Sequence, residues 1–458
     1  MIYILFCFIA FILFNSYWFA NIKNLREVAE GGASLGMRTL LVSLVMFLAL
    51  LLWQALVAKH IRLQRFFLIF LLFSAYFVFK IIVDIADVAV LRAFTIATTG
   101  GIFFFYTIGA IIGILLYRIK KLTMASVQCA KMVMFLFFIY LLCHSYMLFT
   151  TFVGLGADVR IDRFLLSDLG GAYQRPGAFL VMSTFVLSIL YMNSLLSGYV
   201  NFRHTFLLNL FRIICFCIYV AVCLTSMILA QLIGSNNALI CISGMLILAV
   251  AFHILLFYPK IRFILNNRAV KLKEVISRDI RKGVVKSAFV SVACVAAVLI
   301  IVMATLQIDV SMLRITGFGD GETSVSSRNE ILSSFPDQFF HSVSTPFFGH
   351  MLVHELSEAP NYIHSFLGSI LTHLGIVGFL IVTSFLYMAL KNLFQTESSV
   401  DLYTNGMNIY KTLLFVGIFV VATSSVFLHW SPIWFLTGIL FVPVRFINGS
   451  SGNYNKIG

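Results

Sequence analysis

The sequence predicts an all-α protein that crosses a membrane about twelve times, and three observations support this. Hydrophobic residues make up 61% of the chain, charged residues only 11%, and the mean hydropathy is +1.00. Soluble domains carry roughly 25% charged residues, so this chain could not cover a water-facing surface. Apolar stretches of about 20 residues, the length of helix that crosses a bilayer core, recur along it. We therefore expect one integral membrane domain over residues 1–458.

Twelve apolar windows are long enough to be transmembrane helices. The first has no basic segment before it, so we expect a retained helix rather than a cleaved signal. No internal repeat is evident, which disfavours a transporter built from inverted repeats. The windows lie at about 2–20, 39–58, 66–86, 94–117, 132–153, 179–199, 211–232, 237–258, 287–305, 364–390, 412–429 and 432–447.

The distribution of Lys and Arg sets the expected orientation, because cytoplasmic loops are enriched in both. With both termini inside, the inner loops hold 22 of the 32 Lys and Arg, Lys411 among them, and the outer loops hold nine. The net charge of +14 is thus a topology signal, and we expect no nucleic-acid partner. Two outer loops are long, at 154–178 and, between the ninth and tenth helices, at 306–363. Loops of this length are usually functional or disordered.

Both long outer loops carry arginines near an expected membrane boundary. Arg175 stands just before the sixth helix, and Arg328 precedes apolar residues at the spacing of a short surface helix. A guanidinium in such a place either anchors the chain at the interface or binds phosphate oxygens with its two-pronged donor set. Both interpretations stay open from local context. Arg160 and Arg163 in the first outer loop are further candidates.

His350 and His354 lie four residues apart, which on a helix would place both imidazoles on one face. Zinc pairs have this spacing, but no third ligand is marked and the order of Glu and His is not that of a metalloprotease. Loop histidines are the alternative. We therefore expect no metal and no cofactor, and we keep His350 as a further candidate site residue.

The stretch NYIHSFLGSILTHLGIVGFL at 361–380 opens the tenth predicted helix with a histidine. At about 100° per residue one stripe carries glycines that allow close approach of another helix, while His373 faces the opposite side with no assigned role. An ionisable group at the end of such a helix is a functional candidate, and histidine can accept a proton from a sugar hydroxyl. The stripe consists of His364, Gly368, Leu371, Gly375 and Gly378.

These segments together resemble the superfamily of O-antigen ligases and Wzy-type O-antigen polymerases. His364-Ser-Phe-Leu followed by Gly375 and Gly378 is similar to the outer-loop His and G-x-x-G of that family. The run from Ser327-Arg328 to Thr345-Pro-Phe-Phe-Gly349 looks like its Arg-bearing loop helix and P-x-x-G turn, and Arg175-Pro-Gly-Ala-Phe resembles its R-x-G-x-F motif. The chain departs from the family in lacking an Asn-Pro pair after Arg175 and a Ser-Arg near 226–237.

The resemblance implies a GT-C-like, metal-independent glycosyltransferase of the bacterial inner membrane with a periplasmic active site. Its substrates would be undecaprenyl-diphosphate-linked glycans as donor and acceptor, with membrane lipids and a chain-length regulator as further partners. His364 would be the catalytic base, and Arg175 and Arg328 would bind the diphosphate, as two-pronged donors can. We expect a polymerase of oligosaccharide repeat units. A ligase acting on lipid A-core, a transporter of lipid-linked glycans and a non-enzymatic assembly partner remain alternatives.

Overall fold

The computed structural model describes residues 63–88, 90–91, 102, 106, 109–110, 174–201, 206–232, 235–257, 333–357, 363, 365–394, 402–422 and 431–440. These residues are overwhelmingly helical, and no strand occurs among them, which confirms the predicted all-α class for this part of the chain. Two stretches, Asn236–His253 and Phe366–Ser384, are long and apolar enough to cross a membrane. Among the described residues, continuous helices overlap seven of the twelve predicted windows: 66–86, 179–199, 211–232, 237–258, 364–390, 412–429 and 432–447. 

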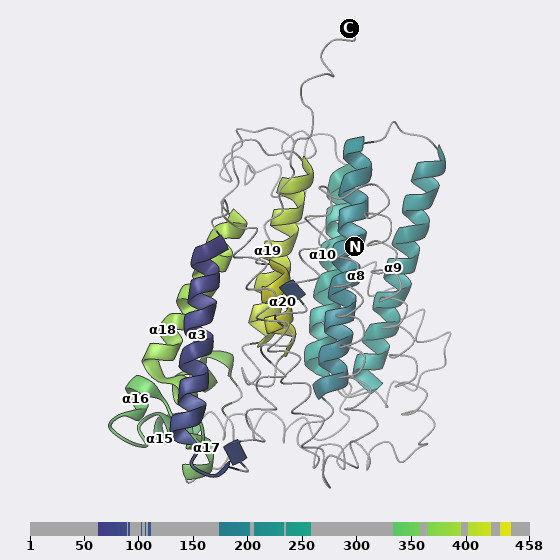
Figure 1. Cartoon of the computed structure of the whole chain (residues 1–458). Coiled ribbons are helices and arrows are strands. Elements are labelled where there is room, and N and C mark those ends of the chain that lie inside the picture. Colours follow the sequence, from purple (N-terminus) through teal and green to yellow (C-terminus); the bar gives the residue numbers. More distant parts are fainter. Residues whose placement is uncertain are drawn as a thin grey trace.

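Three long helices form one side of the bundle: α8 (Gln174–Asn201), α9 (Phe206–Leu232) and α10 (Asn236–Phe257). A tight turn joins α9 to α10, in which Ser235 N donates to Ala230 O at 2.7 Å. α8 and α10 run parallel, because Gly177 faces Ser235 near their starts and Tyr191 bonds His253 near their ends. α9 runs antiparallel to both (Figure 1).

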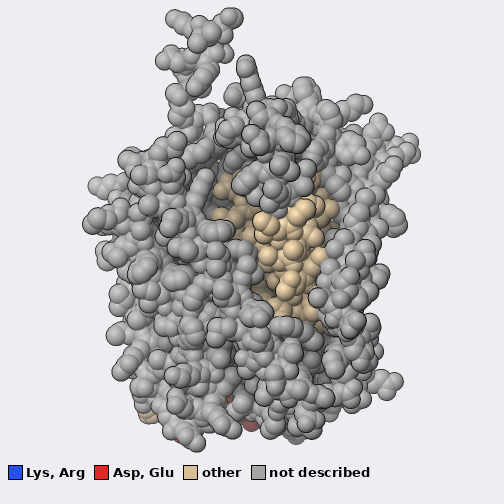
Figure 2. All heavy atoms as spheres, turned by 90° about the vertical axis from the view of Figure 1, so that its right-hand side faces the viewer, with Lys and Arg blue, Asp and Glu red and all other residues tan. Residues whose placement is uncertain are grey.

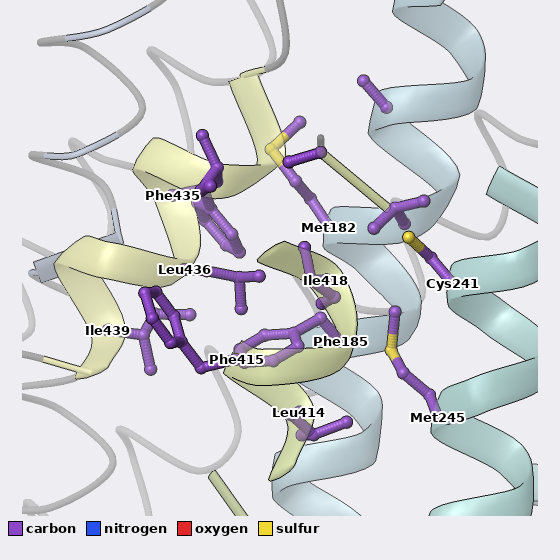
Figure 3. Packing of buried hydrophobic residues seen from close by; sticks show 14 of the residues in the cluster. Met182, Phe185, Cys241, Met245, Leu414, Phe415, Ile418, Phe435, Leu436 and Ile439 are labelled. Atoms are coloured by element: carbon purple, nitrogen blue, oxygen red, sulfur yellow. The ribbon is translucent and has the colours of Figure 1, made fainter. Parts of the chain in front are cut away.

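The core lies where α8 and α10 meet α19 (Leu402–Ala422) and α20 (Ser431–Leu440). Figure 3 shows aliphatic, aromatic and sulfur-containing side chains from all four helices turned toward one another. α19 is antiparallel to α8, since Tyr410 bonds Ser188 and the earlier Gly406 faces the later Leu196. Shape-matched apolar contacts of this kind are what hold helices together where water supplies no driving force. The labelled set is Met182, Phe185, Cys241, Met245, Leu414, Phe415, Ile418, Phe435, Leu436 and Ile439.

Lys411 differs from its predicted position. It was counted with the inner loops, but it lies in the middle of α19 and is buried, at 1% exposure. The cause is that α19 begins at Leu402, ten residues before the predicted window. The first residues of α19 include several polar ones, so a hydropathy scan does not detect this part of the helix. Four of the 22 cations assigned to inner loops are therefore helix residues: Arg65, Arg212, Lys391 and Lys411.

The other side of the bundle pairs α3 (Leu63–Asp84) with α18 (Phe366–Phe394) (Figure 1). α18 is not the single straight helix that the glycine stripe assumed, because Gly375 has φ 65° and ψ −171° and kinks it. The part after Gly375 runs antiparallel to α3. The part before it starts at Phe366, whose ring contacts Phe419 of α19 and Trp434 of α20. Residues before and after this kink therefore do not lie on one common face, as a spacing of about 100° per residue would assume.

One flank of the molecule has a central patch of described residues without charged side chains (Figure 2). Seen from the right-hand side of Figure 1, where α9 lies, a broad central patch carries neither basic nor acidic side chains (Figure 2). Ile218 of α9 is 54% exposed, and it would be costly to leave such residues in water. This surface is of the kind that faces hydrocarbon in a membrane.

Candidate functional site at the docked turn

The segment that bears the P-x-x-G pattern folds into the short helix α16 (Thr345–Phe348), which ends at Gly349. Pro346 occupies the first turn, where its missing N–H costs no hydrogen bond. Gly349 N donates to Thr345 O at 2.7 Å, and its own φ of 68° with ψ −177° falls in a region that glycine alone adopts readily. We call Thr345–Gly349 the docked turn.

The docked turn packs backbone to backbone against α18. A Cβ on Gly349 would overlap the main chain of His373 and Leu374, and a Cβ on Gly375 would overlap that of Phe347. Gly375 also has the backbone conformation typical of glycine, at φ 65°. The predicted close approach at the glycine stripe therefore occurs at Gly375, but its partner is this turn rather than another helix.

α3 fastens the docked turn from the other side. Lys80 Nζ donates to Gly349 O at 2.9 Å and to Asp84 Oδ1 at 2.8 Å, and Asp84 Oδ2 accepts the N–H of Met351 at 2.8 Å. The side chains of Lys80 and Asp84 are 7% and 5% exposed. An ion pair so buried requires such extra hydrogen bonds to offset its desolvation.

Tyr76 of α3 and the docked turn also satisfy polar groups that the kink in α18 exposes. Tyr76 Oη donates toward Leu374 O at 2.9 Å and Phe348 O at 3.0 Å, and His350 N donates to Thr372 O at 3.1 Å. A kink interrupts the i to i−4 ladder and frees carbonyl groups that need partners. The three segments α3, α16 and α18 therefore form one hydrogen-bonded unit.

His350 and His354 do not share a helix, so the alternative of a helical histidine pair does not apply. Gly349 and His350 belong to no helix, a turn follows, and α17 (Val353–Leu356) begins only at Val353, so no helix carries both imidazoles. Leu352 N donates to His350 Nδ1 at 3.2 Å, whereas the buried His354 ring stacks on His373 with centroids 5.7 Å apart. His373, expected to face away without a role, is thus part of the docking contact. Among the described residues no group of three or more potential metal ligands occurs.

His350 is the one candidate site residue whose side chain the structure describes. Partial burial lowers the pKa of its imidazole, Lys80 and His341 act in the same direction, and the Asp84 carboxylate opposes them. The bond from Leu352 N requires a lone pair on Nδ1, so it too favours the neutral ring. Burial and this hydrogen bond therefore both favour the neutral imidazole of His350, which lies beside a buried ion pair.

Arg175 lies in the first turn of α8, not in the loop before the helix, because α8 begins at Gln174 rather than near residue 179. Pro176 suits a first helical turn, which explains the earlier start. A Cβ on Gly177 would lie 2.8 Å from Ser235 Cβ, so this turn touches the α9–α10 connection. That connection is the place where the family's Ser-Arg was missing. The Arg175 side chain itself lies outside the described residues.

Four predicted site residues lie outside the described part of the chain: His364, Arg328, Arg160 and Arg163. The flanks of His364 are described. Ile363 is fully buried, and Phe366 packs between α19 and α20. Within the predicted surface helix after Arg328, the described portion is the five-residue α15 (Phe335–Phe339), where Phe335 stacks on Phe339.

The part that α3 plays was not predicted from the sequence. Its signal was present, because Lys80 and Asp84 stand four residues apart in an apolar window, the spacing of a helical ion pair. Charged residues inside a transmembrane helix mark functional or structural sites by default. What the spacing alone could not identify is the partner, residues 349–351, which lie about 270 positions away in the sequence.

Comparisons with known proteins found no match: no protein-family model, no curated protein and no solved structure is similar to this chain.

Proposed function

We propose that this protein polymerises undecaprenyl-diphosphate-linked oligosaccharide repeat units at the periplasmic face of the bacterial inner membrane. The proposal includes twelve transmembrane helices with both termini in the cytoplasm. It rests on the resemblance of the motifs around Arg175, Arg328, Pro346 and His364 to the polymerase and ligase superfamily.

One structural observation supports the proposal most. The P-x-x-G and G-x-x-G patterns, which the resemblance selects from separate segments, pack against each other at Gly349 and Gly375. The start of α8, which carries Arg175, lies beside the α9–α10 turn, the position at which this chain lacks the Ser-Arg of the resembled family.

The proposed reaction consists of three events at this site. The hydroxyl oxygen of the acceptor attacks the anomeric carbon of the donor, the bond from that carbon to phosphate breaks, and undecaprenyl diphosphate leaves. His364 accepts the hydroxyl proton, which is ordinary general-base chemistry. Arg175 and Arg328 offset the negative charge that develops on the diphosphate, so the protein itself supplies fixed cations.

The test is to supply the purified full-length protein with lipid-linked repeat units extracted from host cells that lack this chain. A polymerase lengthens the glycan with no other acceptor, giving a ladder on a gel, and chelator does not change the rate. A product that forms only after lipid A-core is added would replace polymerase with ligase. Movement of the lipid-linked unit across vesicles without any lengthening would replace both with a transporter.

A further inference from the structure

The docked turn lies alongside α3 rather than beyond its end. Tyr76 bonds Phe348 O and Lys80 bonds Gly349 O, and these two residues stand eight and four positions before Asp84, the last residue of α3. At 1.5 Å per residue, Tyr76 is about 12 Å from that end of the helix. The turn therefore reaches back along the helix by roughly a third of the thickness of a bilayer core.

At this level both the helix and the turn expose apolar side chains. Phe79 and Val83 of α3 are each 59% exposed, and Phe347 and Phe348 of the turn are 56% and 52% exposed. The exposed apolar surface continues into the preceding bend, through Phe340 and Val343. Water is an unfavourable neighbour for so many adjacent aromatic and aliphatic groups.

The charge pattern agrees with a hydrocarbon neighbour. No Lys, Arg, Asp or Glu occurs from Gln338 to His354, a run of residues that belongs to the longest outer loop. The run offers no permanent charge for a charged peptide to pair with; its titratable side chains are His341, His350 and His354. α18, against which the turn packs, contains one of the two described stretches that are long and apolar enough to cross a membrane.

The backbone N–H groups of the turn and two of its outward carbonyl groups are satisfied by the protein itself. Each backbone N–H from Phe347 to Met351 has a partner within the protein, at 2.7 to 3.2 Å. The carbonyl groups of Phe348 and Gly349, which point out of the short helix, are taken by Tyr76 and Lys80. Irregular backbone at membrane depth is tolerated only where protein satisfies it in this way. 

From these observations we propose that Thr345–Gly349 is a re-entrant turn whose Phe347 and Phe348 contact the acyl chains of the outer leaflet. The loop 306–363 would thus not lie wholly in the periplasm. Its docked turn dips into the bilayer beside α3, and the Lys80–Asp84 pair secures it from the protein side. This inference depends on membrane insertion of the chain and not on the polymerase proposal.

The test uses the full-length protein in nanodiscs of zwitterionic lipid, with a nitroxide attached through p-acetylphenylalanine at position 348, which leaves the eight native cysteines unlabelled. Relaxation by oxygen reports exposure to hydrocarbon, and relaxation by a water-soluble nickel chelate reports exposure to water. Asp337, an exposed polar residue of α15, is the water-facing control, and Phe79, an exposed apolar residue of α3, is the control expected to face lipid.

We expect the label at 348 to resemble the one at 79, with several-fold lower nickel accessibility and higher oxygen accessibility than at 337. Nickel accessibility equal to that at 337 would overturn the proposal, since the turn would then face water. Protection from both reagents would also overturn it, as would line broadening that vanishes on dilution with unlabelled protein, because another protein surface would then cover the turn. The same measurement at position 347 guards against misfolding at one labelled site.

Discussion

Gly349 and Gly375 meet backbone to backbone, so closely that a methyl group built on Gly375 would lie 2.5 Å from the amide nitrogen of Gly349. The contact joins a loop turn to the kink of a long helix, and both glycines have φ near +65°. Side chains on either residue would separate the two segments. This junction, fastened by α3, is the structural centre of the candidate site.

Replacing Gly375 with Ala will destabilise the protein. An alanine there has an unfavourable backbone conformation, worth about 1–3 kcal/mol by itself, and its methyl group overlaps the main chain of Phe347. We expect a lower free energy of unfolding in SDS titration from mixed micelles, and faster cleavage of the 345–351 segment by protease. Gly244→Ala is the control, because nothing lies within 4 Å of that position and alanine favours a helix by roughly 0.5–1 kcal/mol. Equal behaviour of the two variants would contradict the docking contact.

Replacing one partner of the Lys80–Asp84 pair will lower the free energy of unfolding more than replacing both. Either Lys80→Met or Asp84→Asn leaves one buried partner uncompensated, which typically costs about 3–5 kcal/mol. The double variant should lose less than the sum of the single variants, as coupled residues do. A double-mutant cycle on the free energy of unfolding measures this coupling, and a strictly additive cycle would show that the pair is not formed. Asp87→Asn, an exposed carboxylate on the same segment, provides the control.

Docking of the 345–351 segment should weaken in acid because of His350. The pKa of its imidazole is lowered in the folded protein by burial, so the unfolded segment binds a proton first as the pH falls. The contribution of neutral His350 to the stability of docking is complete at pH values above about 6.5, the ordinary pKa of histidine. It declines as the pH falls below that value and stops changing below the lowered pKa of His350 in the folded protein. Hydrogen exchange of the 345–351 amides between pH 7.5 and 5.5, corrected for intrinsic rates, follows the change.

His350→Asn is the matched variant for that experiment. The Asn side-chain oxygen can accept the N–H of Leu352, since asparagine commonly bonds the backbone two residues on. This variant should keep the turn docked and lose the dependence on pH. If the dependence persists, it originates elsewhere, with His341 and His354 the next histidines to replace.

His364→Ala should abolish glycan lengthening while leaving the fold intact. Removal of a general base typically lowers the rate by about 10²–10⁴-fold. His373→Ala is the instructive comparison, because His373 is fully buried against His354 and its loss should lower stability. The measurements are the rate of lengthening and the free energy of unfolding for both variants. Full activity of His364→Ala would refute the assignment of the base.

The sequence by itself determined the helical class and the approximate position of seven described helices. Hydropathy and length are enough to predict both features, because a transmembrane helix forms its backbone hydrogen bonds internally and needs only about 20 apolar residues. It located α10 and the start of α18 to within two residues, at Asn236 and Phe366. It also selected both segments that meet at Gly349 and Gly375, although with a helix as the expected partner.

Only the tertiary structure decided how those segments are used. The kink at Gly375, the role of His373 and the attachment of the turn by Lys80 and Asp84 all depend on contacts between residues far apart in the chain. A helical wheel assumes a continuous helix, so it could not show which face of α18 meets the loop. Hydropathy placed Lys411 in an inner loop because it scores residues one by one, whereas burial of a charged side chain is decided by its neighbours in space.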